Sequence, residues 1–302
     1  MSSPDVYFPI AILVAMAVAG MTLFVWWWKR SPLSFGQILL WSVNYLIAKL
    51  LWDTQVEGRL PRHGGAVIVA NHRSSVDPSF IQIAIRRVVY WMVAREYCEA
   101  PGLGLLLRTF QVIPVGRGGV DTAATKLAIR LAQEGGLVGM FPEGRINETH
   151  DPILLPGRPG VALVALKARV PIIPVWISGS PYDGTPIGPL KMRAHVRVRI
   201  GPTIDISTYF GREKEEGVTQ EITLRVLKEL AKLAGDPDFQ PQLAGRRWKT
   251  GDDAIDLGNG NGNGDGTENN KLPLNPGEGR DEGPAANNGE AHSATARDTS
   301  PQ

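Results

Sequence analysis

Only one of the 302 residues is cysteine, and this scarcity excludes two kinds of structure. The single thiol, Cys98, can form neither a disulfide within the chain nor a cysteine-rich zinc site. It has no catalytic partner beside it in the sequence Arg95-Glu-Tyr-Cys-Glu99, so we interpret it as a small structural residue. The cysteine count predicts a reducing compartment.

Metal and nucleotide motifs are also missing. The five histidines, at positions 63, 72, 150, 195 and 292, show no spacing typical of metal ligands. Gly116-Arg-Gly-Gly119 lacks the Gly-Lys-Ser/Thr ending of a P-loop. Asn261-Gly-Asn-Gly-Asp-Gly266 imitates half of a calcium loop, but Leu272 stands where the twelfth residue would be Glu. We therefore expect no metal and no bound cofactor.

The formal net charge of +2 conceals an uneven distribution. Residues 251–302 hold three Lys or Arg against ten Asp or Glu, whereas the first 250 residues hold 29 against 20. A basic body suits an anionic membrane surface or phosphate-bearing ligands, and charge alone would suit nucleic acid equally. The C-terminal segment is rich in Gly, Asn, Asp, Glu and Pro, so 241–302 is predicted to be a disordered acidic tail.

The N-terminus carries one long apolar segment. Residues 7–28 contain no charge, and a helix of about 20 such residues spans a bilayer. A cleaved signal peptide is the alternative, but no basic segment precedes the run and no small-residue cleavage site follows it. Tryptophans at 26–28 suit an interfacial belt, and Lys29 and Arg30 predict that the body lies on the cytoplasmic face of the membrane, behind a single-pass or monotopic anchor.

A second segment, 34–52, has apolar residues at helical spacing with Gln37, Asn44 and Lys49 between them. This amphipathic helix either lies in the membrane interface beside the first helix or covers the core of the body. Both interpretations make residues 1–53 an anchoring unit.

Between residues 54 and 240, short runs rich in Val and Ile alternate with helical stretches. Strands are predicted at 66–70, 88–94, 110–115, 137–141, 172–177 and 194–200, and helices at 78–86, 120–133, 160–169 and 219–234. This alternation predicts an α/β domain with a mostly parallel sheet flanked by helices.

The segment from Val67 to Pro78 runs from an apolar strand into a polar turn that carries His72 and Asp77. Open α/β sheets bind ligands beyond the carboxyl ends of their strands. A histidine there can accept the proton of an alcohol, and a carboxylate on its other ring nitrogen fixes the tautomer. The alternative is structural, with Asp77 as a helix N-cap before Pro78 and His72 as an ordinary turn residue.

Three further blocks follow in order. Phe110-Gln-Val-Ile-Pro-Val-Gly-Arg117 is a strand that ends near an arginine, Gly139-Met-Phe-Pro-Glu-Gly-Arg-Ile146 is a strand followed by a tight turn, and Val170-Pro-Ile-Ile-Pro-Val175 is a strand with two prolines. The alternative for each arginine is that it is an ordinary surface residue without a binding role.

The four blocks together, over residues 47 to 235, resemble the signature blocks of the glycerolipid and lysophospholipid acyltransferases, among them the 1-acyl-sn-glycerol-3-phosphate acyltransferases. The resemblance implies that His72 is the general base and that Asp77 orients it. The acceptor hydroxyl would attack the thioester of acyl-CoA or acyl-carrier protein directly, with no acyl-enzyme. That donor is a cosubstrate, so the expectation of no cofactor stands.

The resemblance also implies binding residues for a lysophospholipid acceptor. Arg117 matches the phosphate-binding arginine, Glu143 and Gly144 match the third block, and the proline-rich strand would shape the acyl-donor side. Most phosphatidate-forming members read Phe-Pro-Glu-Gly-Thr-Arg, whereas Arg145 follows Gly144 directly here. The expected product is phosphatidate, and acylation of lysophosphatidylethanolamine or an ornithine-type lipid is the alternative, with Arg145 still a candidate acceptor ligand.

Two other classes of function fit less well. A serine hydrolase would need a Gly-x-Ser-x-Gly elbow, and neither Ser74 nor Ser75 stands in one. A catalytically silent membrane scaffold would need neither His72 nor Asp77.

Overall fold

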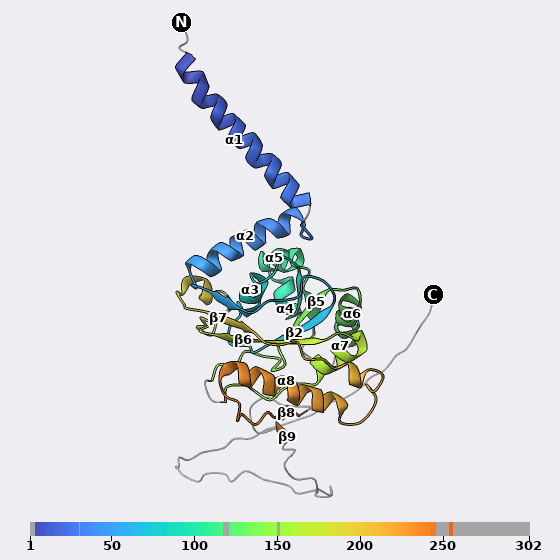
Figure 1. Cartoon of the computed structure of the whole chain (residues 1–302). Coiled ribbons are helices and arrows are strands. Elements are labelled where there is room, and N and C mark those ends of the chain that lie inside the picture. Colours follow the sequence, from blue (N-terminus) through green and yellow to red (C-terminus); the bar gives the residue numbers. More distant parts are fainter. Residues whose placement is uncertain (1–3, 30, 117–120, 150–151, 246–253, 256–302) are drawn as a thin grey trace, which may run out of the picture. The chain divides into compact units, whose positions relative to one another are not determined.

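The computed structural model describes residues 4–29, 31–116, 121–149, 152–245 and 254–255 (Figure 1). The helices are α1 Pro4–Lys29, α2 Phe35–Leu50, α3 Asp77–Gln82, α4 Arg95–Glu99, α5 Leu103–Thr109, α6 Thr122–Gln133, α7 Gly160–Ala168 and α8 Val218–Ala234, with 3-10 turns η1 Gly188–Lys191 and η2 Ser207–Tyr209. The strands are β1 Gln55–Glu57, β2 Ala66–Ala70, β3 Val89–Ala94, β4 Ile113–Val115, β5 Leu137–Met140, β6 Ile172–Ser178, β7 Arg197–Ile200, β8 Leu243–Ala244 and β9 Ala254–Ile255. Most of the predicted acidic tail lies outside the described residues.

Seven strands form one sheet in the order β1-β7-β6-β2-β5-β3-β4. Strands β6, β2, β5, β3 and β4 are parallel to one another. Strand β7 is antiparallel to β6, and β1 pairs in parallel with β7. The prediction of a mostly parallel α/β sheet flanked by helices is confirmed.

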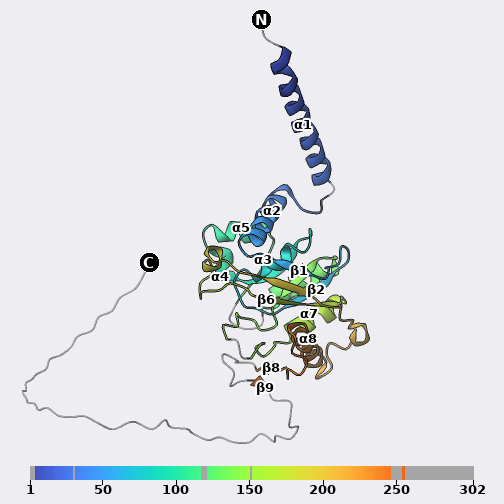
Figure 2. The same cartoon turned by 60° about the vertical axis from the view of Figure 1, so that its left-hand side comes forward.

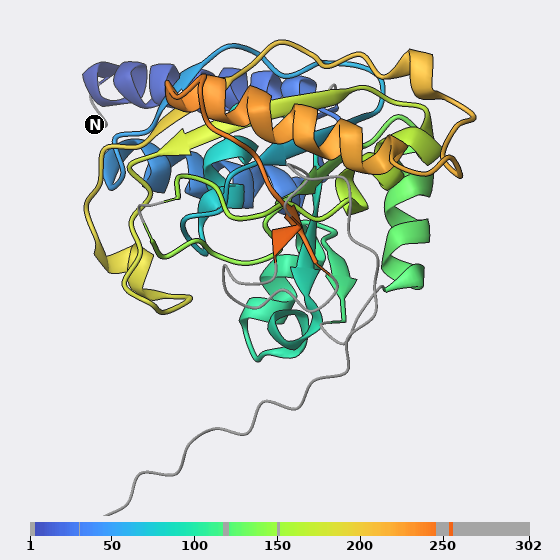
Figure 3. The same ribbon diagram turned by 90° about the horizontal axis from the view of Figure 1, so that it is seen from below.

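The central strand β2 is buried on both faces and separates two cores. Val67 and Val69 face one core, which includes residues of α6, α7 and α8, whereas Ile68 faces the other, which includes residues of α2 and α3. Alternate residues of a strand point to opposite faces, so this one apolar run serves both layers. Figures 1 and 3 show α8 across one face of the sheet, opposite α2 and α3.

Three predicted elements were too long by three or more residues, and one of them, β7, begins at Arg197 instead of Ala194. Strand β4 begins at Ile113 instead of Phe110, because α5 continues to Thr109 and Gln111 then takes a φ of 54° to leave the helix. Helix α3 ends at Gln82 instead of Arg86, because the Gln82 amide bonds to the carbonyls of Ile85 and Arg87 and closes a turn. Strand β1 and helices α4 and α5 were not predicted, because short segments carry too little periodicity.

The two N-terminal helices differ in their surroundings (Figure 2). Residues Tyr7–Trp26 of α1 have a mean hydropathy of 2.4, are not buried, and are long and apolar enough to cross a membrane. Helix α2 begins with a capping box formed by Ser34 and Gln37 and buries Ile38 against the body. Its other face exposes apolar side chains, including Leu39 and Leu46, so α2 covers the core on one side and leaves an apolar surface on the other.

Candidate active site

The turn that follows β2 is tied to the neighbouring strand. The Asn71 side chain donates to the carbonyl of Ile177 at 2.8 Å and accepts from the Ile177 amide at 2.7 Å, and Asn71 is fully buried. Because these bonds fix the end of β2 against the end of β6, the turn begins from a rigid position. The next residue is His72.

His72 and Asp77 meet inside this turn. The imidazole Nδ1 lies 3.0 Å from Oδ2 of Asp77, and the side chains are 16% and 0% exposed. The same oxygen accepts the amides of Arg73 at 2.6 Å and Ser74 at 2.7 Å, and Oδ1 accepts the Ser180 hydroxyl at 2.7 Å. The carboxylate is thus held at a fixed angle to the ring.

The alternative structural interpretation of Asp77 as a helix N-cap is wrong. Asp77 is the first residue of α3, Val76 occupies the cap position, and no side chain caps the helix. The Asp77 carboxylate instead turns back toward the loop that precedes it. A buried, four-bonded carboxylate beside a histidine is the arrangement that keeps the ring proton on Nδ1 and leaves Nε2 for another partner.

The His72 ring stacks on an aromatic side chain. The ring centroids of His72 and Phe141 are 3.9 Å apart with an interplanar angle of 8°, and Phe141 stacks in turn on Trp91 at 4.8 Å. Gly139 makes room for this stack, because a Cβ there would lie 2.5 Å from the Trp91 ring. The stacked rings of Phe141 and Trp91 hold the plane of the His72 imidazole in place.

Glu143 lies beneath the turn and is fully buried. Its Oε1 accepts the amide of His72 at 2.8 Å, and Oε2 accepts the amide of Leu155 at 2.9 Å. Burial raises the pKa of Glu143 to about 7, against the opposing effects of these two amides and of His72 and Arg73. Because both oxygens bond to the backbone, the geometry favours a positioning role over the acceptor contact that the resemblance implies.

The Glu143 pKa predicts a pH dependence of stability. Between its ordinary value of 4.5 and about 7, the folded state holds more protons than the unfolded state, so the free energy of unfolding falls as pH rises through this window. In Glu143→Gln this pH-dependent fall in the free energy of unfolding, on the order of 3 kcal/mol, is absent. Urea unfolding at several pH values should give a flatter profile for the variant, and parallel profiles would contradict the prediction.

Two residues not predicted as site residues hold the loop that faces His72. The Asn147 amide donates to the carbonyl of His72 at 2.8 Å. The Arg73 guanidinium donates to the carbonyls of Asn147 at 3.3 Å, Ile153 at 2.8 Å and Thr149. Burial lowers the Arg73 pKa, which the charges of Glu143 and Asp77 oppose. Arg73 therefore acts as an internal cross-link.

The remaining predicted binding residues occupy different positions. Gly144 has a φ of 68° in a tight turn, and a Cβ there would lie 3.2 Å from Nε of Arg158, so the Arg158 side chain lies over this turn. Arg145 follows and is partly exposed. Strand β4 ends at Val115, and Arg117 lies outside the described residues.

Comparisons with known proteins match the segment that carries the candidate site. A family model described as Acyltransferase matches residues 53–178, the range that holds His72, Asp77 and Glu143. Residues 53–178 therefore form an acyltransferase domain. It is 25% identical over 175 residues to a 1-acyl-sn-glycerol-3-phosphate acyltransferase of Bacillus subtilis, covering 57% of this chain and 83% of that one. It is 32% identical over 132 residues to the human beta enzyme of the same name, covering 43% and 47%.

The fold of this acyltransferase also has a solved counterpart. The crystal structure of the 1-acyl-sn-glycerophosphate (LPA) acyltransferase from Thermotoga maritima superposes with a TM-score of 0.52 and 21% identity, over 81% of this chain and 96% of that one. At this identity the likeness concerns the architecture.

Ser74, Ser75 and Cys98 are poorly placed to act as nucleophiles. Ser74 is fully buried and its hydroxyl donates to the carbonyl of Pro181 at 2.5 Å, while Ser75 donates to the carbonyl of Pro186 at 2.9 Å. Cys98 is buried, and burial raises the pKa of its thiol. Within the described ranges, no group of three His, Cys, Asp or Glu side chains is arranged to hold a metal ion.

Proposed function

We propose that this acyltransferase transfers a fatty acyl group from acyl-CoA or acyl-carrier protein to the free hydroxyl of 1-acyl-sn-glycerol-3-phosphate and forms phosphatidate at a membrane. The observation that carries the proposal is the contact of His72 with the buried Asp77 at the carboxyl end of β2. The names of the bacterial and human relatives support the choice of acceptor.

In the proposed reaction, His72 Nδ1 donates its hydrogen to Asp77 and Nε2 receives the proton of the acceptor hydroxyl. The hydroxyl oxygen attacks the thioester carbonyl, the carbon–sulfur bond breaks, and the departing thiolate takes the proton from the imidazolium. The negative charge of Asp77 stabilises that imidazolium. The products are an ester and a free thiol.

The membrane attachment belongs to the same proposal. Helix α1 supplies the apolar length, and Lys29 and Arg30 in the sequence favour a catalytic domain on the cytoplasmic face. The exposed apolar face of α2 would then lie at the bilayer surface, where both a lysophospholipid and an acyl chain are present.

A panel of acceptors tests the proposed function. Membranes that contain the full chain are offered lysophosphatidate, lysophosphatidylethanolamine and a lyso-ornithine lipid, each with acyl-CoA and with acyl-carrier protein. We expect turnover of lysophosphatidate that is absent in a His72→Ala blank. Turnover of none of the acceptors would contradict acyl transfer to a lysophospholipid.

The second candidate acceptor rests on the turn after Glu143. Arg145 directly follows Gly144, where a Gly-Thr-Arg order is typical of the phosphatidate-forming members, and Arg158 lies over the same turn. Because the cations at this turn differ from those of the phosphatidate-forming members, a different head group on the acceptor lipid is favoured. Turnover of lysophosphatidylethanolamine without lysophosphatidate would decide for this alternative.

Ser180 is expected to act through Asp77. Ser180→Ala removes one hydrogen bond to a buried carboxylate, typically worth about 1.5–3 kcal/mol, so kcat should fall by about tenfold or more with KM unchanged. Ser180→Thr keeps the hydroxyl and should restore most of kcat. An equal loss in both variants would show that size at this position matters and the hydroxyl does not.

A further inference from the structure

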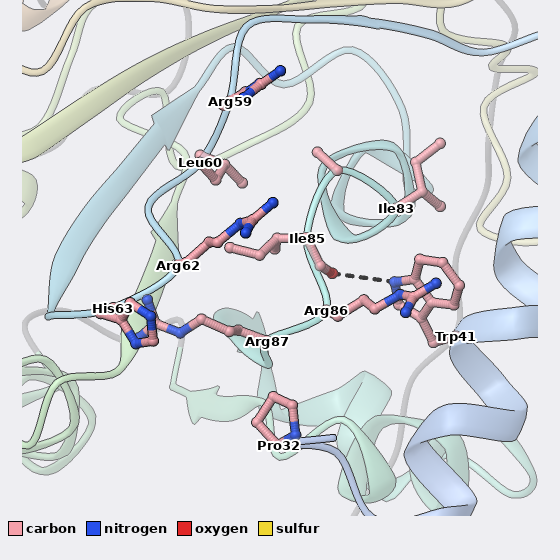
Figure 4. Close-up of a pocket in the computed structure, with 11 residues that line it drawn as sticks. Pro32, Trp41, Arg59, Leu60, Arg62, His63, Ile83, Ile85, Arg86 and Arg87 are labelled. Atoms are coloured by element: carbon pink, nitrogen blue, oxygen red, sulfur yellow. Dashed lines mark hydrogen bonds between the residues drawn. The ribbon is translucent and has the colours of Figure 1, made fainter. Parts of the chain in front are cut away.

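A pocket of about 740 Å³, shown in Figure 4, lies at the ends of β2 and β3 that are opposite the candidate active site. Arg62 and His63 in its wall precede β2, and Arg86 and Arg87 precede β3, whereas His72 follows the carboxyl end of β2. A strand of five residues is about 15 Å long, so the pocket is separate from the His72 site.

The wall of the pocket is strongly basic. Four arginines, Arg59, Arg62, Arg86 and Arg87, and the histidine His63 line it. Among the described residues that line the pocket there is no Asp or Glu. A concave surface with one sign of charge concentrates counter-ions, and the planar guanidinium matches the geometry of a phosphate. The lining therefore favours an anion with phosphate oxygens.

Hydrogen bonds hold the three segments of the pocket together. Arg87 donates to the carbonyls of Pro61 and Gly64, both at 2.9 Å, and of Gly135. The Trp41 indole donates to the carbonyls of Gln82 and Ile85, both at 3.1 Å, and the bond to Ile85 is drawn in Figure 4. The pocket is thus formed without a ligand, and the Arg87 guanidinium is occupied by these hydrogen bonds to the backbone.

Arg59 and Arg62 have a different position. Both side chains are exposed, and Figure 4 shows them on the segment before β2, with Arg62 extending toward Ile85. The described contacts commit neither guanidinium to a carboxylate. Both guanidinium groups are therefore accessible to an anion in the pocket.

Apolar side chains in the pocket favour a lipid over a free anion as the ligand. Leu60, Ile83 and Ile85 line the pocket beside the arginines, and Trp41 of α2 forms one wall. The opposite face of α2 exposes apolar residues. We propose that this pocket binds the phosphate-bearing head group of an anionic bilayer phospholipid, with Arg59 and Arg62 as its ligands. The site is independent of the proposed reaction at His72.

The test measures lipid binding by the full chain in a nonionic detergent. Dihexanoyl phosphatidylglycerol is titrated below its micelle concentration and binding is followed by calorimetry. In Arg59→Gln/Arg62→Gln, which loses two charge-assisted interactions, Kd should rise at least about tenfold. The control Arg130→Gln/Lys228→Gln removes the same charge from exposed positions of α6 and α8, and its Kd should stay within about twofold of the unchanged protein.

Two further titrations separate the sources of the phosphate. Inorganic phosphate should compete only weakly, and dihexanoyl phosphatidylcholine, which has the same chains without net charge, should bind less tightly. Competition by inorganic phosphate at the affinity of the lipid would overturn the assignment to a head group. Equal Kd values for the Arg59/Arg62 variant and the control, with thermal unfolding unchanged in both, would overturn the site itself.

Discussion

Replacing His72 with Ala is expected to lower kcat by about 10²–10⁴-fold, the range that a general base contributes. The substitution removes Nε2 and with it the acceptor for the hydroxyl proton, while Asp77 keeps its bonds to Arg73, Ser74 and Ser180. Release of free thiol from acyl-CoA at saturating lysophosphatidate measures the loss.

The matched control is His195→Ala. His195 is exposed and pairs only with the exposed Asp53 among the contacts described for it, so its removal should leave kcat unchanged. Added imidazole should restore part of the activity of His72→Ala, because the substitution opens space beside Phe141. Retention of more than about a tenth of the original kcat would contradict a role in proton transfer.

The central strands and long helices were predictable because burial forces a pattern on their sequences. Strand β2 is apolar at five consecutive positions, and its bounds match the prediction. Helix α8 alternates buried and exposed residues over four turns, and its predicted start was one residue late. Strand β1 has three residues and is mostly exposed, so no comparable pattern marks it.

The contact between His72 and Asp77 was predictable because six consecutive residues contain both, whereas the residues that support the pair were not. Ser180 is 103 residues from Asp77 and Glu143 is 71 residues from His72, so tertiary structure alone brings them together. The resemblance implied a role for Glu143, and the two backbone amides on its carboxylate favour a positioning role. The arginines before β2 carry no motif at all, and their pocket forms only where Trp41 of α2 comes beside the segments that precede β2 and β3.

Replacing Asp77 with Asn should lower kcat by about 10²–10³-fold, because it removes a charge and leaves the geometry in place. The asparagine oxygen can occupy the Oδ2 position and still accept from His72, Arg73 and Ser74, while its amide donates to the Ser180 hydroxyl. A unit charge about 4 Å from an imidazolium is worth about 4 kcal/mol at an effective dielectric of about 20, and partial solvation reduces this. The loss should therefore be smaller than in His72→Ala.

A double variant shows whether Ser180 and Asp77 act as one unit. If Ser180 serves only to hold the Asp77 charge, Ser180→Ala should change kcat by less than about threefold when Asn already stands at position 77. Asp205→Asn, in an exposed turn, is the control for loss of a carboxylate and should leave kcat unchanged. Full additivity of the two substitutions would separate Ser180 from the pair, and an Asp77→Asn enzyme with unreduced kcat would show that the imidazolium does not need the charge.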